Sequence, residues 1–105
     1  MAVNLDNVTV THNETAERFE ILVDGLRALL TYRRFPGSIV FLHAELPPSL
    51  EGRGLAGKLT SFALDYARAN HLRVVPRCPY VSSFIRMHAE YQDLVSAEDL
   101  QKLRG

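Results

Sequence analysis

The sequence predicts a mixed α/β fold of the α+β kind, with an antiparallel sheet in its first half and helices in its second. Short apolar runs separated by turn residues fill residues 8–46, which is typical of strands joined by hairpins. From Leu55 onward apolar residues recur at helical spacing, and a short apolar run at 72–76 follows that helix. A strand, a helix and a second strand in this order pair in parallel through a right-handed crossover. We therefore expect four antiparallel strands, a crossover helix, a parallel fifth strand and flanking helices.

The composition indicates one domain that spans residues 1–105, since 47% of the residues are hydrophobic and can form a core. Twelve basic and twelve acidic residues leave no net charge, which argues against a nucleic-acid binder that works through bulk electrostatics. The apolar runs are too short to cross a bilayer and no signal peptide is recognisable, so we expect a cytoplasmic protein that binds no membrane. A single cysteine excludes an internal disulfide and paired-cysteine metal ligands, and no metal is expected.

Four strands are expected in the first half, at residues 8–12, 19–23, 26–35 and 38–46. Asp24-Gly25 is a strong hairpin signal between the second and third of them, and Pro36-Gly37 makes the next turn. The fourth run is apolar on both faces at its start, which predicts a central place in the sheet.

Three helices are expected in the second half. The first spans residues 55–69, ends at Asn70-His71 and carries an apolar stripe of Leu55, Leu59, Phe62, Ala63, Tyr66 and Ala67. Pro79 is favoured at the first position of the second helix, which carries Phe84, Ile85, Met87 and His88. Residues 91–95 are interpreted as a loop or short strand, and residues 97–104 as a terminal helix with Leu100 and Leu103 facing inward.

The junction between the fourth strand and the first helix, residues 47–59, carries the strongest signal for a binding site. Its glycines Gly52, Gly54 and Gly57 let the backbone pass close to another object. The amides of the first helical turn have no partner inside the helix, and with the helix dipole they make a site for an anion such as a phosphate. The junction is neither a Walker loop nor the dinucleotide fingerprint, because it lacks Gly-Lys-Ser/Thr and follows hairpins. The alternative is a tight turn that needs glycine only for its dihedral angles.

Four antiparallel strands, a glycine-rich turn that opens a helix, a fifth strand and a second helix together resemble the GNAT N-acetyltransferase superfamily. There the turn has the form Gln/Arg-x-x-Gly-x-Gly/Ala, and its amides hold the pyrophosphate of acetyl-coenzyme A (acetyl-CoA). The matching segment is 51–56, where Glu51 departs from the usual Gln or Arg, while Arg53 and Lys58 supply positive charge. The resemblance implies an acetyl-CoA site formed by Leu46, Gly52, Arg53, Gly54, Leu55, Ala56, Gly57, Lys58, Cys78 and Phe84.

A narrower resemblance extends over nearly the whole chain, to small single-domain GNAT proteins of the YidJ type, which are uncharacterised N-acetyltransferases. It rests on the order and spacing of blocks that include residues 18–21, 43–47, 52–56, 76–81 and 88–91. Such proteins are shorter than typical GNAT enzymes and lack the early helices that help shape an acceptor site. The resemblance therefore implies the fold and the cofactor but does not identify the acceptor.

His43 and Glu45 are the candidate bases. They lie two residues apart on a predicted strand and so share one face just before the glycine turn. In GNAT chemistry an amine is deprotonated and attacks the acetyl carbonyl directly, so a base near the thioester is useful. The alternative is that His43 forms a hydrogen bond within the sheet and Glu45 faces water.

Cys78 and Tyr80 are expected beside the thioester. At the cap of the second helix, next to Arg77, Cys78 is placed where the dipole favours a thiolate, which could accept and pass on the acetyl group. It could also be a residue of the cofactor site without that role, or a small buried apolar residue. Tyr80 resembles the phenols that protonate the departing coenzyme thiolate in GNAT enzymes, and its alternative is a packed tyrosine with a hydrogen-bonded hydroxyl.

These features together predict an N-acetyltransferase that transfers acetyl from acetyl-CoA to an amine, by direct attack. The acceptor, a small molecule or a protein lysine or N-terminus, cannot be read from the residues, nor can the oligomeric state. A non-catalytic acyl-CoA sensor or adaptor is the alternative, because the short chain lacks the usual early helices. A plain interaction domain would not bind coenzyme A at all.

Overall fold

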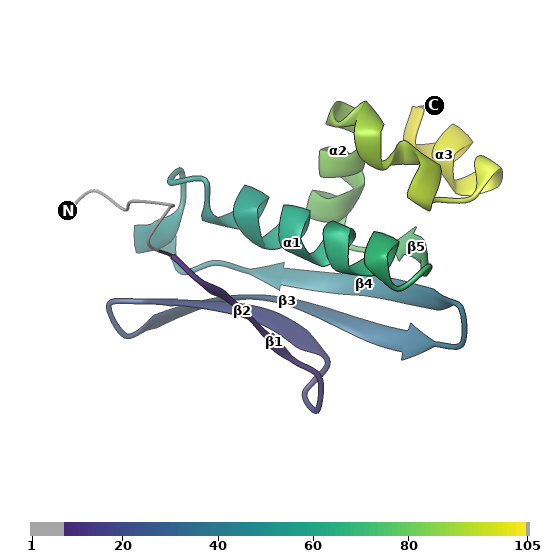
Figure 1. Cartoon of the computed structure of the whole chain (residues 1–105). Helices are drawn as coiled ribbons and strands as arrows, with labels where there is room; N and C mark the ends of the chain where they lie inside the picture. Colours follow the sequence, from purple (N-terminus) through teal and green to yellow (C-terminus); the bar gives the residue numbers. More distant parts are fainter. Residues whose placement is uncertain (1–7, 105) are drawn as a thin grey trace.

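Five strands form one mixed sheet in the computed structural model, which describes residues 8–104 (Figure 1). The strands are β1 (Val10–Asn13), β2 (Arg18–Val23), β3 (Leu26–Phe35), β4 (Ser38–Glu45) and β5 (Arg73–Pro76). They lie side by side in sequence order, with β1 to β4 antiparallel and β4 and β5 parallel. This confirms the predicted fold class and topology.

The helices all lie on one face of the sheet and leave the other face uncovered by any described helix (Figure 1). They are α1 (Leu55–Ala69), α2 (Pro79–Met87) and α3 (Ala97–Arg104), with short 3-10 helices η2 (Pro48–Leu50) and η3 (Ala89–Leu94). The predicted loop or strand at residues 91–95 is wrong. The side-chain amide of Gln92 donates to the carbonyls of Ile85 and Arg86, and these bonds fold the chain back onto the last turn of α2 as η3.

The core lies between the sheet and the helices. Alternate residues of β3, Ala28, Leu30 and Tyr32, are buried against α1, which follows from the two-residue period of a strand. The buried face of α1 differs from the predicted stripe: Thr60 and Leu64 belong to it, whereas Phe62 is 42% exposed. Because α1 contacts α2 and η3 as well as the sheet, its covered face is shifted toward those elements.

A β-bulge interrupts the pairing of β3 with β4. Thr31 pairs with His43 but the next residue, Tyr32, pairs with Phe41, so Leu42 is left over. The extra residue interrupts the alternation of side chains along β4, so that His43 and Glu45 point to the face opposite Phe41. Phe41 is buried on the helix side, whereas His43 and Glu45 pair with outward-facing residues of β3 and lie on the uncovered face.

Helix α1 is tied to η3 by polar contacts near its C-terminal end. The Arg68 guanidinium donates to both carboxylate oxygens of Asp93, at 2.7 and 2.9 Å, and to the carbonyl of Glu90 at 2.6 Å. The hydroxyl of Tyr91 donates to Asp65 at 3.0 Å. These bonds fix η3, and with it α2, against the solvent side of α1. No described helix is long and apolar enough to cross a membrane.

Aromatic rings pack together where β1, β2 and β3 meet α1. Phe19 is fully buried and contacts the rings of His12, Tyr32, Phe62 and Tyr66, with the His12 ring stacked at 4.2 Å. The His12 Nε2 lies 2.6 Å from the Tyr32 hydroxyl. Burial lowers the pKa of His12, a shift opposed by Glu14 and reinforced by Arg34, and burial raises the pKa of Tyr32 to about 12.

Phe19→Ala removes the ring at the centre of this cluster and should lower the free energy of unfolding by about 3–5 kcal/mol. The matched control is Phe35→Ala, because Phe35 is 48% exposed and should change stability by about 0.5 kcal/mol or less. Denaturant unfolding of both variants measures the difference. Equal losses would show that Phe19 is not a core residue.

Protonation of His12 should destabilise the folded protein. Because the pKa of His12 is lowered from 6.5 in the folded state, the unfolded chain binds its proton first as the pH falls. Stability should therefore be retained above about pH 6.5 and decline as the pH falls below that value, through the lowered pKa of His12. Denaturant unfolding across this range should show a flatter decline for His12→Gln than for the wild type. Parallel curves would contradict a buried, neutral His12.

Candidate functional site

The glycine turn ends in an unusual backbone conformation that opens α1. Gly54 is the residue before the helix and has φ 78° and ψ 5°, the left-handed region that suits glycine, and Gly52 has φ 76°. No side chain caps the helix. The amide of Lys58 donates to the Gly54 carbonyl at 3.1 Å, so the amides of Leu55 and the next two residues precede the first helical bond. They are donors for an anion at this end of the helix dipole.

Helix α2 passes directly over the first turn of α1. A Cβ atom at Gly57 would lie 3.8 Å from the Tyr80 hydroxyl and 3.8 Å from the Phe84 ring. A longer side chain at Gly57 would therefore enter the space between the two helices. The structure thus brings together the predicted residues Gly57, Tyr80 and Phe84, from segments far apart in the sequence.

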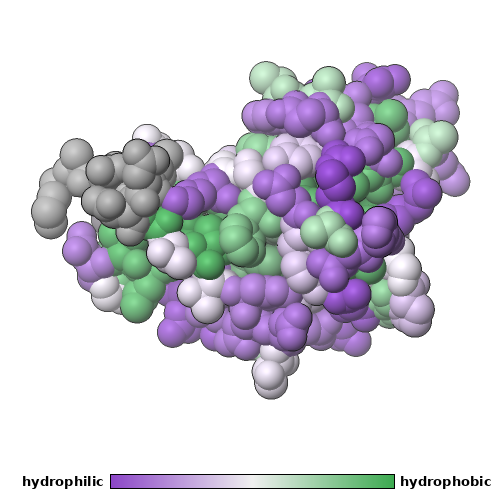
Figure 2. All heavy atoms as spheres, viewed as in Figure 1, coloured by the Kyte–Doolittle hydropathy of each residue, from purple (hydrophilic) through white to green (hydrophobic). Residues whose placement is uncertain are grey.

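An open groove of about 530 Å³ runs beside this contact. It is lined by Gly54, Gly57, Lys58, Ser61, Phe62, Asp65, Phe84 and His88. Four of these residues were predicted site residues, and Phe62 was assigned to the core instead. Hydrophobic surface is visible near the first turns of α1, whereas hydrophilic residues cover most of the α2 and α3 region in the same view (Figure 2).

The aromatic residues of α2 form a row along the groove. The Phe84 ring stacks on the His88 ring with centroids 3.9 Å apart, and the Tyr80 ring lies 6.3 Å from Phe84. The carbonyl of Phe84 also lies 2.7 Å from Nδ1 of His88. The spacing of four residues between Tyr80, Phe84 and His88 was the sequence signal for this row. The same spacing predicts that His88 lines the cofactor's pantetheine arm with Phe84, and its alternative is a structural histidine.

Strands β4 and β5 pair over only part of β4. Their pairing ends at Phe41 and Pro76, after which the Cys78 amide donates to the Phe41 carbonyl at 2.9 Å. Strand β4 continues to Glu45 without a partner residue on β5, and helix α2 contacts β4.

Cys78 and Tyr80 have different surroundings although both begin α2. Cys78 is the residue before the helix, as predicted, but its side chain forms no capping bond and is 2% exposed among core residues. Tyr80 is 41% exposed, and partial burial raises the pKa of its phenol. A raised pKa keeps the phenol protonated, as an acid must be.

His43 and Glu45 form a solvent-exposed pair on the uncovered face of the sheet. The His43 Nε2 lies 4.0 Å from a carboxylate oxygen of Glu45, and their side chains are 64% and 60% exposed. The contacts found among residues 8–104 do not join this pair to Cys78 or Tyr80. Sequence spacing placed the pair on one face, and the bulge at Leu42 decides which face that is.

The remaining predicted residues surround the turn. The Lys58 ammonium donates to the carbonyl of Val8 at 2.5 Å, so this charge is tied to the start of the described chain. Glu51 and Arg53 are exposed, and Leu46 packs partly buried against the core. In the described part of the chain, no group of three or more His, Cys, Asp or Glu side chains is arranged to hold a metal ion.

Comparisons with known proteins agree with this architecture. The family model for GCN5-related N-acetyltransferases matches residues 18–94. Protein NATD1 is 33% identical over 82 residues in Bos taurus, with 75% of this chain and 73% of that protein covered, and 30% identical in Homo sapiens, with the same coverage. The solution structure of a GCN5-like protein from Staphylococcus aureus has a TM-score of 0.68 and 26% identity, covering 86% of this chain and 89% of the other.

These matches and the sheet topology confirm the predicted superfamily and fold. The narrower likeness to the YidJ type stays a prediction. The family model spans the last four strands, the glycine turn and helices α1 and α2, which together form the site described above. The chain belongs to the GCN5-related N-acetyltransferase family.

Proposed function

We propose that the protein transfers acetyl from acetyl-CoA to an amine. The observation that carries this proposal is the start of α1, which follows Gly54 and has no side-chain cap. It comes shortly after the end of β4 that is not paired with β5, in a chain of this family. The free amides of the turn adjoin the open groove lined by Gly54, Gly57 and Phe84, which suits a ligand with a phosphate group and a long thin arm. The single domain and the cytoplasmic location stay predictions from the sequence.

The turn fits the pyrophosphate of coenzyme A. Backbone amides from Leu55 to Gly57 would donate to it, and Gly54, the residue before the helix, carries no side chain that could cover them. Arg53 and Lys58 add positive charge nearby. The pantetheine arm would then run between β4 and α2, past Phe84 and Tyr80, toward the start of α2. Glu51, at the position where the family has Gln or Arg, adds no donor.

The reaction needs a base on the acceptor side and an acid at the leaving group. Imidazole is the commonest general base, and the exposed His43–Glu45 pair is the candidate base for the amine. The neutral amine attacks the acetyl carbonyl, its nitrogen loses a proton to solvent as the carbon–sulfur bond breaks, and the Tyr80 phenol donates its proton to the coenzyme thiolate. The Tyr80 phenolate then regains a proton from solvent. The raised pKa of Tyr80 suits this role because the phenol is protonated at neutral pH.

We assign Cys78 to the floor of the cofactor site and propose direct transfer to the amine. A nucleophile has to reach the thioester carbon, whereas the Cys78 side chain is 2% exposed and packed in the core. Its amide, which donates to the Phe41 carbonyl, supports the point where β4 and β5 separate.

A second candidate is a sensor that binds acyl-CoA without turnover. It is favoured by one observation: the exposed His43–Glu45 pair has no contact with Tyr80 or Cys78 among the described residues. Calorimetric titration with coenzyme A, followed by mass spectrometry of an amine panel with acetyl-CoA, separates the two. Binding with acetylated product supports the enzyme, binding without product supports the sensor, and no binding contradicts both.

Gly54→Val should weaken coenzyme A binding at least tenfold, because the side chain covers the amides that hold the pyrophosphate. The matched control is Gly37→Val in the β3–β4 turn, where φ is 76° and nothing lies within 4 Å of an added Cβ. Both variants place valine in the left-handed region and should lose about 1–2 kcal/mol of stability. Calorimetric titration should show that only Gly54→Val loses the ligand. Unchanged affinity would contradict the proposal that the amides at the start of α1 bind the pyrophosphate.

Cys78→Ala should retain acetyl transfer within about threefold of the wild-type kcat, because direct attack does not use the thiol. Wild-type protein incubated with acetyl-CoA alone should keep its unmodified intact mass. An added acetyl group that is lost in Cys78→Ala, together with loss of turnover, would establish a covalent route instead.

A further inference from the structure

The Lys58 side chain joins the glycine turn to the start of the sheet. Lys58 lines the open groove with Gly54 and Gly57, and its amide makes the first helical bond with the Gly54 carbonyl. Its ammonium donates to the carbonyl of Val8, a residue 50 positions earlier in the chain. Figure 1 shows the beginning of β1 beside the segment that leads into α1. One side chain is therefore in contact with the groove and with the segment that leads into β1.

Strand β1 has few partners in the sheet. It is four residues long, lies at the edge of the sheet and, within the described residues, pairs with β2 alone. A short edge strand contributes few backbone hydrogen bonds, so it opens locally at a lower free energy than a central strand. The side-chain contacts at the two ends of β1 therefore affect how often it opens.

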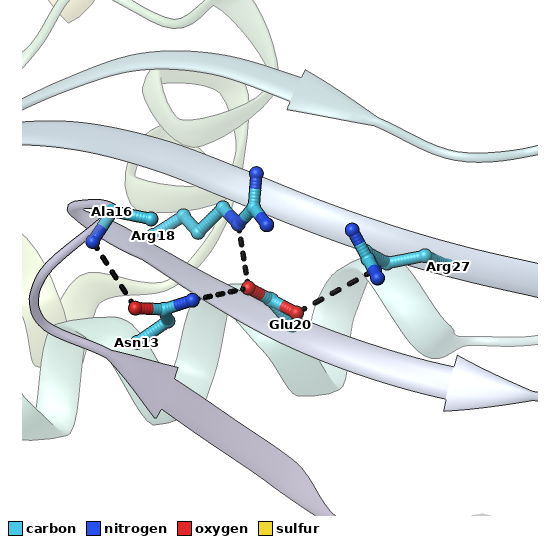
Figure 3. A network of polar contacts seen from close by, with 5 residues as sticks. All are labelled: Asn13, Ala16, Arg18, Glu20 and Arg27. Carbon is cyan, nitrogen blue, oxygen red and sulfur yellow. Dashed lines mark hydrogen bonds and ion pairs between the residues drawn. The ribbon is translucent and has the colours of Figure 1, made fainter.

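The far end of β1 is fixed within the sheet. Asn13 donates through Nδ2 to the Glu20 carboxylate at 3.1 Å, and its Oδ1 accepts from the Ala16 amide at 3.1 Å. Arg18 and Arg27 hold the same carboxylate, at 2.5 and 3.5 Å (Figure 3). These residues do not line the groove beside α1, so this end of β1 is held independently of the glycine turn.

The near end of β1 is held by α1. Val8 packs partly buried against the core, and Val10 is 8% exposed. The Lys58 ammonium adds a hydrogen bond to this packing, and hydrogen bonds from an ionised donor are stronger than neutral ones. The start of β1 is thus attached through a residue of the candidate cofactor site.

An ammonium group can hold a carbonyl and a phosphate at once. It carries three donors, and the bond to the Val8 carbonyl uses one of them. Fixing the long lysine side chain costs conformational entropy, and two contacts of the same ammonium share that cost. Each contact therefore favours the other, which couples them without any change in backbone shape.

We propose that coenzyme A binding orders the start of β1 through Lys58. This inference rests on the proposed function, because the ligand is the coenzyme whose pyrophosphate lies at the start of α1. The Lys58 ammonium contacts the pyrophosphate and keeps its bond to the Val8 carbonyl. Since coupling between two sites is reciprocal, the attached strand also raises the affinity of the turn for coenzyme A.

The test is amide hydrogen exchange of the full chain, measured by NMR with and without saturating coenzyme A. In the wild type, the coenzyme should slow exchange of the β1 amides about fivefold, the lower end of typical coupling between two sites. Residues 35–38, at the turn between β3 and β4, do not line the groove and should exchange at nearly the same rate in both samples.

Lys58→Met removes the ammonium but keeps the apolar stem, and methionine favours helices as much as lysine does. The variant should bind coenzyme A more weakly. At concentrations that saturate it, its β1 amides should exchange as fast as they do without the coenzyme. The matched control is Lys102→Met, which removes the chain's other lysine, 72% exposed in α3. This control should keep the wild-type slowing.

Slowing of the β1 amides that persists in Lys58→Met, or that is missing from the wild type although the coenzyme binds, would overturn this inference alone. Equal slowing at residues 35–38 would also overturn it, because such slowing reports the stability of the whole domain. Calorimetric titration measures binding for each sample. Absence of coenzyme binding would overturn the proposed function and this inference together.

Discussion

The extra residue at Leu42 is the constraint on which the arrangement of the site depends. Strand side chains alternate between faces, so a strand paired without interruption would turn His43 and Glu45 to the same side as Phe41, into the core. Two charged groups there would carry a large desolvation cost. The bulge places them in water on the uncovered face, and β4 extends beyond its last pairing with β5. One extra residue thus separates the candidate bases from the face that the helices cover.

Most of the architecture could be predicted from local patterns. Turn residues such as Asp24-Gly25 and Pro36-Gly37 set the hairpins, and Pro79 began α2 where expected. The bulge could not be predicted, because Phe41 and Leu42 are both apolar and either register buries one of them. Helix η3 was missed because its cause is a tertiary one: the bonds from Gln92 to carbonyls in the last turn of α2.

In the candidate site too, features that depend on a single residue could be predicted, whereas features that depend on the packing of neighbouring helices could not. The glycine turn was recognisable because Gly52 and Gly54 have positive φ angles, a backbone requirement that belongs to single residues. Phe62 was assigned to the core because helical spacing gives a stripe but not its width, and the width depends on how α2 and η3 lie against α1. The salt bridge of Arg68 with Asp93 fixes that placement, and these residues carried no signal of their own.

The connection from β4 to β5 also affects how the chain assembles. The first four strands pair through short hairpins, whereas the paired residues Phe41 and Pro76 are separated in the chain by the whole of α1. Closing a longer loop costs more chain entropy, so this contact is the most expensive of the sheet to form. The antiparallel meander needs only short loop closures, whereas the pairing of β5 with β4 needs the crossover through α1. The part of the chain that carries the candidate site therefore depends on the longest loop closure in the sheet.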